Sequence, residues 1–277
     1  MIFIKKTFQF YIYANIHVSI ATYCMVIITG FCFQTKTCNS AIFIGVSTFV
    51  AYNGIRYLKY KKGLLRDVVF IWFKKNKTPL FLMSFLSAGY LLGMLLMFEI
   101  DSLFALLPFI LMTFLYMYPM QSSKKKSLSL RKIPGFKIFC ISISWSGLVV
   151  LFPLVEGNIE IGVREVLFFL QQFLFVLILT LPFDLRDVSF DEEELKTIPQ
   201  VLGVRKTKIL GVVLGIIFCS ISWMLFEEGF LYITFVVAII QITMLLLSTL
   251  NQSKYFASFW VEGLPLFWLL LLFLLGV

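Results

Sequence analysis

Charged side chains are scarce in this chain, and so are the residues from which most enzymes build their active sites. Its 277 residues include 15 Asp and Glu, 24 Lys and Arg and one histidine, whereas 60% are hydrophobic. Together with a mean hydropathy of +0.94, this composition excludes an ordinary soluble domain. We therefore expect an all-α, polytopic integral membrane protein in which residues 1–277 form one transmembrane helical domain.

Common metal and nucleophile motifs are also missing. The five cysteines include no Cys-x-x-Cys pair, and His17 has no second histidine to complete a zinc site. The chain contains neither a glycine-rich phosphate loop nor a nucleophile elbow. Cys32 and Cys38 flank one short loop, but their spacing alone decides neither for a disulfide nor for two free thiols. Any catalysis must therefore depend on carboxylates.

Apolar runs of roughly 17 to 25 residues, long enough to cross a bilayer, follow one another along the chain. They predict nine transmembrane helices, at residues 10–30, 40–57, 79–98, 103–119, 136–155, 163–183, 208–226, 230–250 and 256–277. Between the second and third spans, residues 64–73 are compatible either with a short helix that places Trp72 at the membrane interface or with an ordinary basic loop.

Basic residues fall almost entirely on one side of these spans. Of the 24 Lys and Arg, 22 lie on the side that holds the N-terminus, and only Lys36 and Arg164 lie on the other. This asymmetry predicts a cytoplasmic N-terminus. The net charge of +9 calls for anionic membrane lipid as a partner and for no nucleic acid, while the oligomeric state stays open.

Three aspartates stand where the sixth span meets the cytoplasmic side. Asp184, Asp187 and Asp191 are spaced i, i+3 and i+7, which on a helix brings their carboxylates within about 60° of arc. Such a surface repels itself unless a cation lies between the carboxylates. The spacing predicts a Mg²⁺-dependent phosphate or diphosphate site with these three as catalytic residues and with Asp187 and Asp191 as metal ligands.

The residues after this aspartate cluster resemble a known family. Thr197-Ile198-Pro199 and Gly203 are similar to the Thr-x-Pro-x-x-x-Gly stretch that follows the second aspartate motif in the UbiA superfamily of intramembrane prenyltransferases. Tyr118-Pro119 resembles the family's Tyr-Pro-x-x-Lys-Arg stretch, although Lys124 comes two positions late. Nine helices, a cytoplasmic N-terminus and an active site on the cytoplasmic side agree with the same family.

The family's first motif, Asn-x-x-x-Asp-x-x-x-Asp, is degenerate in this chain. Asn53 is kept, but Tyr57 and Lys61 stand where the two aspartates would be. The resemblance implies that one metal site is lost while the second motif still holds one Mg²⁺. Lysine neutralises phosphate elsewhere as a point charge. We expect these residues to bind the substrate diphosphate: Asn53, Arg56, Lys61 and Lys196.

Two functions follow from the resemblance. We expect an enzyme, a prenyltransferase that moves a prenyl group from a prenyl diphosphate to an aromatic or lipid acceptor. The alternative is a non-catalytic protein of the same fold that acts in lipid binding or in a membrane assembly. A secondary transporter is less well supported, because the prolines do not break paired helices near the midplane. Mg²⁺-dependent binding of a prenyl diphosphate separates the first two.

The remaining polar residues in the spans have modest interpretations. We expect hydrogen bonds between helices from four polar side chains: His17, Gln171, Gln172 and Gln241. Glu262 lies inside the last span, where an acid is unfavourable unless it faces a polar cavity mouth. The basic run of the fourth span's loop is a membrane-side anchor or, alternatively, a phosphate contact; it comprises Lys124, Lys125, Lys126, Arg131 and Lys132.

Overall fold

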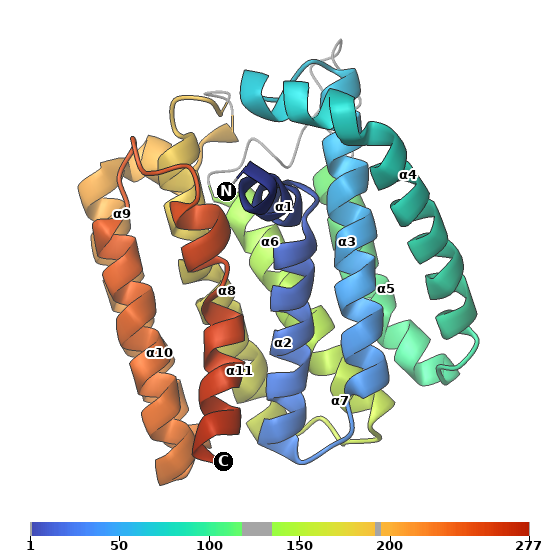
Figure 1. Cartoon of the computed structure of the whole chain (residues 1–277). Helices are drawn as coiled ribbons and strands as arrows, with labels where there is room; N and C mark the ends of the chain where they lie inside the picture. Colours follow the sequence, from blue (N-terminus) through green and yellow to red (C-terminus); the bar gives the residue numbers. More distant parts are fainter. Residues whose placement is uncertain (1, 118–134, 192–194, 277) are drawn as a thin grey trace.

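The computed structural model describes residues 2–117, 135–191 and 195–276, and every regular element within these ranges is helical. In chain order the elements are α1 (Ile2–Tyr13), α2 (Ile16–Phe33), α3 (Cys38–Lys61), α4 (Asp67–Leu95), α5 (Ile100–Met117), α6 (Phe136–Ser146), η3 (Gly147–Leu151), α7 (Phe152–Glu156), α8 (Val163–Asp187), α9 (Ile198–Leu225), α10 (Glu228–Leu247), η5 (Phe256–Val261) and α11 (Leu264–Leu275) (Figure 1).

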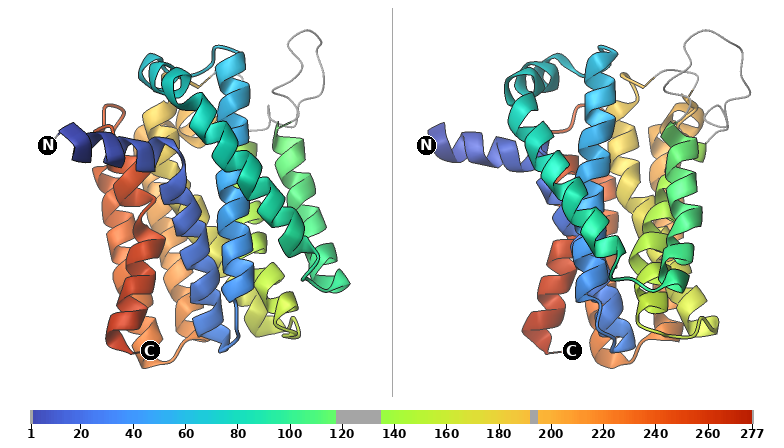
Figure 2. Two further views of the ribbon diagram at one scale, coloured as in Figure 1. Left: turned by 45° about the vertical axis from the view of Figure 1, so that its right-hand side comes forward. Right: turned by 90° about the vertical axis from the view of Figure 1, so that its right-hand side faces the viewer.

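The bundle has the length and hydropathy of a multi-pass membrane protein. In the described part of the chain, eight helical segments are long and apolar enough to cross a membrane, and α5 adds a shorter apolar stretch, Ile100–Thr113. The connections alternate between two ends of the bundle (Figure 2). We call the end that holds residues 61–67, 187–191 and 247–256 the aspartate end, and the end that holds residues 33–38, 156–163 and 225–228 the opposite end.

The first predicted span, 10–30, is two helices. Asn15 adopts a left-handed conformation with φ 60°, and the chain turns there from α1, which projects sideways from the bundle, into α2, which runs along it (Figure 2). Asparagine tolerates this conformation better than most residues. The Asn15 side chain donates a hydrogen bond of 3.1 Å to Asn53 Oδ1 in α3, so a contact between distant segments fixes the turn.

The predicted interfacial segment 64–73 and the predicted span 79–98 belong to one helix. α4 has 29 residues and continues through Pro79, and its first turns lie over the aspartate end (Figure 1). The alternative of a basic loop is therefore wrong from Asp67 onward. Trp72 packs its ring 5.8 Å from Phe10 and 5.3 Å from Tyr13, between centroids. These contacts join the start of α4 to α1.

Two further predicted spans have different bounds in the structure. α9 begins at Ile198 rather than at residue 208 and is kinked at Gly203, whose φ of 76° glycine adopts readily. The last span is divided into η5 and α11, which meet at Glu262 and Gly263. Both breaks lie nearer the aspartate end, so this end is less regular than the middle of the bundle.

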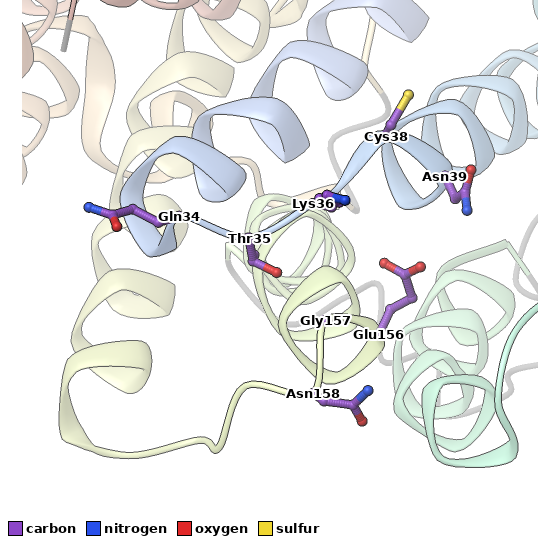
Figure 3. Close-up of a pocket in the computed structure, with 8 residues that line it drawn as sticks. All are labelled: Gln34, Thr35, Lys36, Cys38, Asn39, Glu156, Gly157 and Asn158. Carbon is purple, nitrogen blue, oxygen red and sulfur yellow. The ribbon is translucent and has the colours of Figure 1, made fainter.

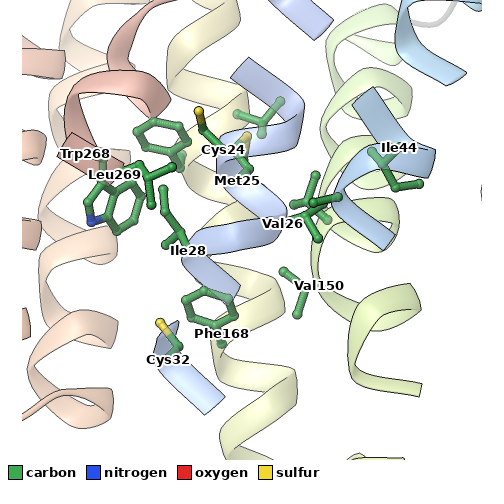
Figure 4. Packing of buried hydrophobic residues seen from close by; sticks show 14 of the residues in the cluster. Cys24, Met25, Val26, Ile28, Cys32, Ile44, Val150, Phe168, Trp268 and Leu269 are labelled. Atoms are coloured by element: carbon green, nitrogen blue, oxygen red, sulfur yellow. The ribbon is translucent and has the colours of Figure 1, made fainter. Parts of the chain in front are cut away.

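The main core surrounds α2 (Figure 4). Met25 and Ile28 are almost fully buried there beside Phe168 of α8 and Trp268 of α11. Hydrogen bonds between helices add to this packing, as predicted: Gln171 donates to Ser222 Oγ at 2.6 Å, linking α8 to α9. Close packing and such bonds, rather than expulsion of water, hold helices together in lipid.

His17 and Gln241 also make the predicted contacts between helices. Tyr11 Oη donates to His17 Nδ1 at 2.7 Å, and His17 Nε2 donates to the Phe259 carbonyl at 2.9 Å. Gln241 donates to the Phe175 carbonyl at 2.7 Å. Because both ring nitrogens of His17 are occupied in this way, its role is to tie α1 and α2 to η5. All five cysteines are free thiols in the structure, so no disulfide joins Cys32 to Cys38.

Candidate functional site

The three aspartates lie at and just beyond the end of α8. The helix ends at Asp187, so Asp184 and Asp187 are helical and Asp191 is not, contrary to the single helical surface predicted for all three. A turn follows, in which the Asp191 amide donates to the Asp187 carbonyl at 2.8 Å. Asp184 is buried, with 3% of its surface exposed. The cluster is therefore built from a helix end and the turn after it.

Lys137 connects two of these carboxylates. Its Nζ lies 2.9 Å from Asp184 Oδ1 and 3.0 Å from Asp191 Oδ2. Lys137 is in the first turn of α6, two residues after Gly135, which caps the start of the helix with a φ of 73°. The Gly135 amide donates to the Lys196 carbonyl at 3.3 Å, which ties this turn to the segment before α9. The sequence places Lys137 only among the 22 basic residues on the side of the N-terminus and does not predict this role.

Asp187 has two arginine partners. Arg66, just before α4, forms an ion pair with its Oδ1. Arg186 donates from Nε to Oδ1 at 2.8 Å and from Nη2 to Oδ2 at 3.0 Å. The Arg66 guanidinium also stacks over the Phe190 ring, 4.3 Å from its centroid. Both oxygens of Asp187 are thus engaged by arginine.

Arg56 and Glu262 extend the charged cluster toward α3 and the last span. Glu262 is close enough to Arg56 and Arg186 to interact with both charges. The Arg56 Nη1 is buried without a hydrogen-bond partner, and so is Asp184 Oδ2. Unpaired buried polar atoms are rare and indicate a place for a ligand or water. Four carboxylates and four cationic side chains meet at this end: Asp184, Asp187, Asp191, Glu262, Arg56, Arg66, Lys137 and Arg186.

The other three residues predicted to bind diphosphate make contacts outside this charged cluster or are exposed. Asn53 is buried and donates to the carbonyls of Ala14 and Phe49, both at 2.9 Å, in addition to accepting from Asn15. Lys61 is exposed at the end of α3, with Nζ 5.0 Å from the centroid of the Tyr57 ring. Lys196 is exposed as well. These contacts give Asn53 a structural part in the turn between α1 and α2.

The predicted Mg²⁺ site does not fit the donor set as it is arranged. Within residues 2–117, 135–191 and 195–276, no group of three or more His, Cys, Asp and Glu side chains is placed to hold a metal ion. A divalent cation between Asp184 and Asp191 would have to displace the ammonium group of Lys137. Asp187, the other predicted ligand, has its oxygens on Arg66 and Arg186.

Two surface pockets lie away from the aspartates. A polar pocket of about 630 Å³ lies at the opposite end, where the loop after α2 faces the end of α7 (Figure 3). Ser40 donates to Glu156 Oε2 at 2.7 Å beside it. An apolar groove of about 590 Å³ lies between α9 and α10, with Cys219, Trp223 and Ile242 among its lining residues. Its composition suits contact with lipid.

Some predicted features lie outside the described residues. They are the Tyr118-Pro119 pair and the basic run of Lys124, Lys125, Lys126, Arg131 and Lys132. The Thr-x-Pro stretch is described: the Thr197 amide donates a hydrogen bond to Gln200 Oε1 at 2.9 Å, and Pro199 lies in the first turn of α9. This stretch therefore starts the helix that follows the cluster.

Comparison with known proteins identifies the fold. No protein-family model matches the chain, and no curated protein matches it. Solved structures of a UbiA homolog from Archaeoglobus fulgidus do match. The form bound to GPP and Mg²⁺ has a TM-score of 0.62 at 13% identity, covering 96% of this chain and 100% of that one. The form bound to DMAPP and Mg²⁺ also has a TM-score of 0.62 at 13% identity, with 96% and 98% covered.

A third structure of the Archaeoglobus fulgidus UbiA homolog agrees, with a TM-score of 0.59 at 14% identity over 94% of this chain and 97% of that chain. Because nearly the whole of both chains is covered, the likeness concerns the complete bundle and not one helical hairpin. The chain therefore has the UbiA-like fold, with the aspartate cluster at one of its ends.

Proposed function

We propose that the protein is a UbiA-type membrane prenyltransferase, which transfers a prenyl group from a prenyl diphosphate to an aromatic or lipid acceptor. The observation that carries this proposal is the aspartate end itself. In a fold shared with a protein that binds GPP and DMAPP, segments far apart in sequence bring Asp184, Asp187, Lys137 and Arg66 together. Charged clusters of this kind inside a membrane bundle mark functional sites.

The chemistry requires charge stabilisation at the leaving group. The bond between the allylic carbon and the diphosphate oxygen breaks, negative charge develops on that oxygen, and the acceptor then attacks the carbon and releases a proton. Each preorganised group that stabilises such charge contributes about 10²- to 10³-fold in rate. In this chain the candidates are Arg56, Lys137 and Arg186, held in place by the carboxylates around them.

Arg56 is the first of these groups that we assign to the diphosphate. Its Nη1 is buried and has no partner, so this N–H is available to a phosphate oxygen. Guanidinium groups bind phosphate through paired N–H donors. The aspartates then act as positioning groups for the cations: Asp184 and Asp191 hold Lys137, and Asp187 holds Arg66 and Arg186.

The topology that goes with this function has nine transmembrane crossings, with the N-terminus and the aspartate end on the cytoplasmic side. Two observations support this proposal. Connections alternate between the two ends along the chain, and α5 contributes the ninth apolar segment (Figure 2). The basic residues of the sequence gather in the connections at the aspartate end, as the positive-inside rule requires of the cytoplasmic side.

The test is ligand-dependent stabilisation of the purified protein in detergent. We expect geranyl diphosphate to raise the melting temperature, and geraniol and inorganic diphosphate to raise it less, because each offers only part of the ligand. Asp187→Asn is expected to reduce the effect, while Glu156→Gln, at the opposite end, serves as the matched control. Formation of a prenylated product in an acceptor screen then establishes turnover. Equal responses to all three ligands would contradict the proposal.

A second candidate is a non-catalytic protein of the same fold that binds a lipid or joins a membrane assembly. The observation that favours it is the saturation of the aspartates by basic side chains, since Lys137, Arg66 and Arg186 leave the cluster without net negative charge. This candidate predicts that the protein binds geranyl diphosphate but releases no inorganic diphosphate from it, whichever acceptor is added. That result would select it over the enzyme.

A further inference from the structure

We infer that Lys137 takes the place of a metal ion: its ammonium group is the cation held between Asp184 and Asp191, and the site binds a prenyl diphosphate without Mg²⁺. This inference rests on the proposed function and adds the identity of the cation at the same site. It departs from the Mg²⁺ requirement that the sequence predicts, and it stands on the ion pairs that the structure shows.

The geometry of Lys137 is that of a bridging cation. Its Nζ contacts one oxygen of each carboxylate, at 2.9 Å and 3.0 Å, and the side chains of Asp184 and Lys137 are 4% and 17% exposed. A carboxylate buried to this degree stays ionised only beside a compensating positive charge. Lys137 supplies it from α6, while the two aspartates come from α8 and the turn after α8.

Lys137 lies on a helix whose position is fixed by contacts with neighbouring segments. Gly135 starts α6 with a left-handed conformation and bonds to the Lys196 carbonyl. The next residue along the helix, Ile138, is 2% exposed and packs in a cluster with Leu181 and Leu185 of α8. The backbone that carries Lys137 is thus anchored on the same helix that carries Asp184.

Asp187 is not a better metal ligand than Asp184 or Asp191. Mg²⁺ demands near-octahedral oxygen ligands and is usually held by one or two carboxylates together with substrate phosphates. Both oxygens of Asp187 already accept from Arg186, and Arg66 adds a second guanidinium. A divalent cation here would face three cationic side chains at close range in a partly buried site, where charges are weakly screened.

The diphosphate is then neutralised by side chains directly. Arg56 Nη1 is buried without a partner, and Arg56 and Arg186 both lie near Glu262. Asp184 Oδ2 is also buried and unpartnered, so this carboxylate can still accept one more hydrogen bond. Lysine and arginine both bind phosphate by charge-assisted hydrogen bonds.

The first experiment measures metal binding by the ligand-free protein. Mn²⁺ is titrated into the purified protein and the free ion is followed by electron paramagnetic resonance. We expect no saturable site below millimolar Mn²⁺ in the wild type, and one site in Lys137→Met, where the two carboxylates are released. Lys206→Met removes an exposed lysine of α9 by the same change and is the matched control. A saturable site in the wild type, lost in Asp191→Asn, overturns the inference.

The second experiment measures the Kd of geranyl diphosphate in EDTA and in Mg²⁺. The wild type is expected to bind equally in both, within twofold. In Lys137→Met, affinity in EDTA is expected to fall at least tenfold and to recover in Mg²⁺, because the freed carboxylates accept the metal. Wild-type binding that appears only with Mg²⁺ overturns the inference while leaving the proposed function intact.

The two failures are therefore distinct. If geranyl diphosphate binds in neither condition, the proposed function is wrong, and metal-free binding falls with it. If Lys137→Met does not fold, the wild-type measurements in EDTA, Mg²⁺ and Mn²⁺ still decide, since each has one outcome that supports Lys137 as the cation and one that excludes it.

Discussion

The two ends of the bundle handle charge in different ways. At the opposite end, the Glu156 carboxylate accepts from the Ser40 hydroxyl, and Arg164 donates to the Cys32 carbonyl at 3.1 Å. Charged groups there bind neutral ones beside an open pocket. At the aspartate end, Asp184 and Asp187 are instead paired with cations that come from segments 47 and 121 residues away.

The fold concentrates charge at the aspartate end, where the ion pairs are partly buried and add little to the free energy of unfolding. A buried ion pair often stabilises a protein no more than apolar residues of the same volume would. Loops as short as those of the opposite end close a helical bundle without such pairs. The cluster at the aspartate end is thus better explained by a ligand than by folding, and the following variants test the contrast from the largest expected effect to the smallest.

Asp184→Ala is expected to cause the largest loss. It leaves Lys137 partly buried without one of its carboxylates, which costs about 3 to 5 kcal/mol of unfolding free energy. Denaturant titration in detergent, followed by circular dichroism, measures it. The charge-free pair Asp184→Leu with Lys137→Met should recover most of the loss. If Asp184→Ala unfolds like the wild type, the buried ion pair is not formed.

Phe168→Ala provides the apolar reference. Phe168 is fully buried in the main core beside α2, and removing a ring from such a site costs about 3 kcal/mol or more (Figure 4). Because this residue lies away from the aspartate end, the Kd of geranyl diphosphate should stay within twofold for the protein that remains folded. The same unfolding titration and a binding isotherm measure both quantities, and a tenfold change in Kd would show that the ligand reaches this part of the core.

Asn53→Ala separates two roles of one residue. Its amide donates to the Ala14 and Phe49 carbonyls and accepts from Asn15, so its loss should cost about 1 to 2 kcal/mol by leaving buried groups unpaired. The exposed Asn39 is the matched control for the same change. Should ligand affinity fall tenfold with stability unchanged, Asn53 holds the diphosphate, as the resemblance to the prenyltransferases implies.

Glu156→Gln is expected to have the smallest effect. The amide oxygen of the new side chain still accepts from Ser40, so the free energy of unfolding should change by less than about 0.5 kcal/mol. Affinity for geranyl diphosphate should not change. A large loss of affinity in this variant would move the binding site to the pocket at the opposite end (Figure 3).

The sequence predicts the helices well and their breaks poorly. Apolar runs locate α8 and α10 almost unaided, because burial in lipid requires continuous helix. The turn at Asn15 depends on its bond to Asn53, 38 residues away, and no local pattern encodes it. The division of the last span at Glu262 was signalled only by the acid itself.

The same limit applies to the candidate site. The sequence alone identifies Asp184, Asp187 and Asp191 as candidates, because closely spaced carboxylates at the end of a span repel one another unless a cation lies between them. Lys137 and Arg66 were missed, since their pairing depends on which helices become neighbours. One available signal was that Lys137 directly follows Gly135-Phe136 at the start of a span on the same membrane side as the aspartates.

The most direct test of the account is a structure of the protein with a non-hydrolysable thio analogue of geranyl diphosphate. We predict that the diphosphate lies at the aspartate end in contact with Arg56, with Lys137 still between Asp184 and Asp191. An analogue found in the pocket beside Glu156, or absent from a fully folded protein at saturating concentration, would contradict the assignment of this end as the prenyl diphosphate site.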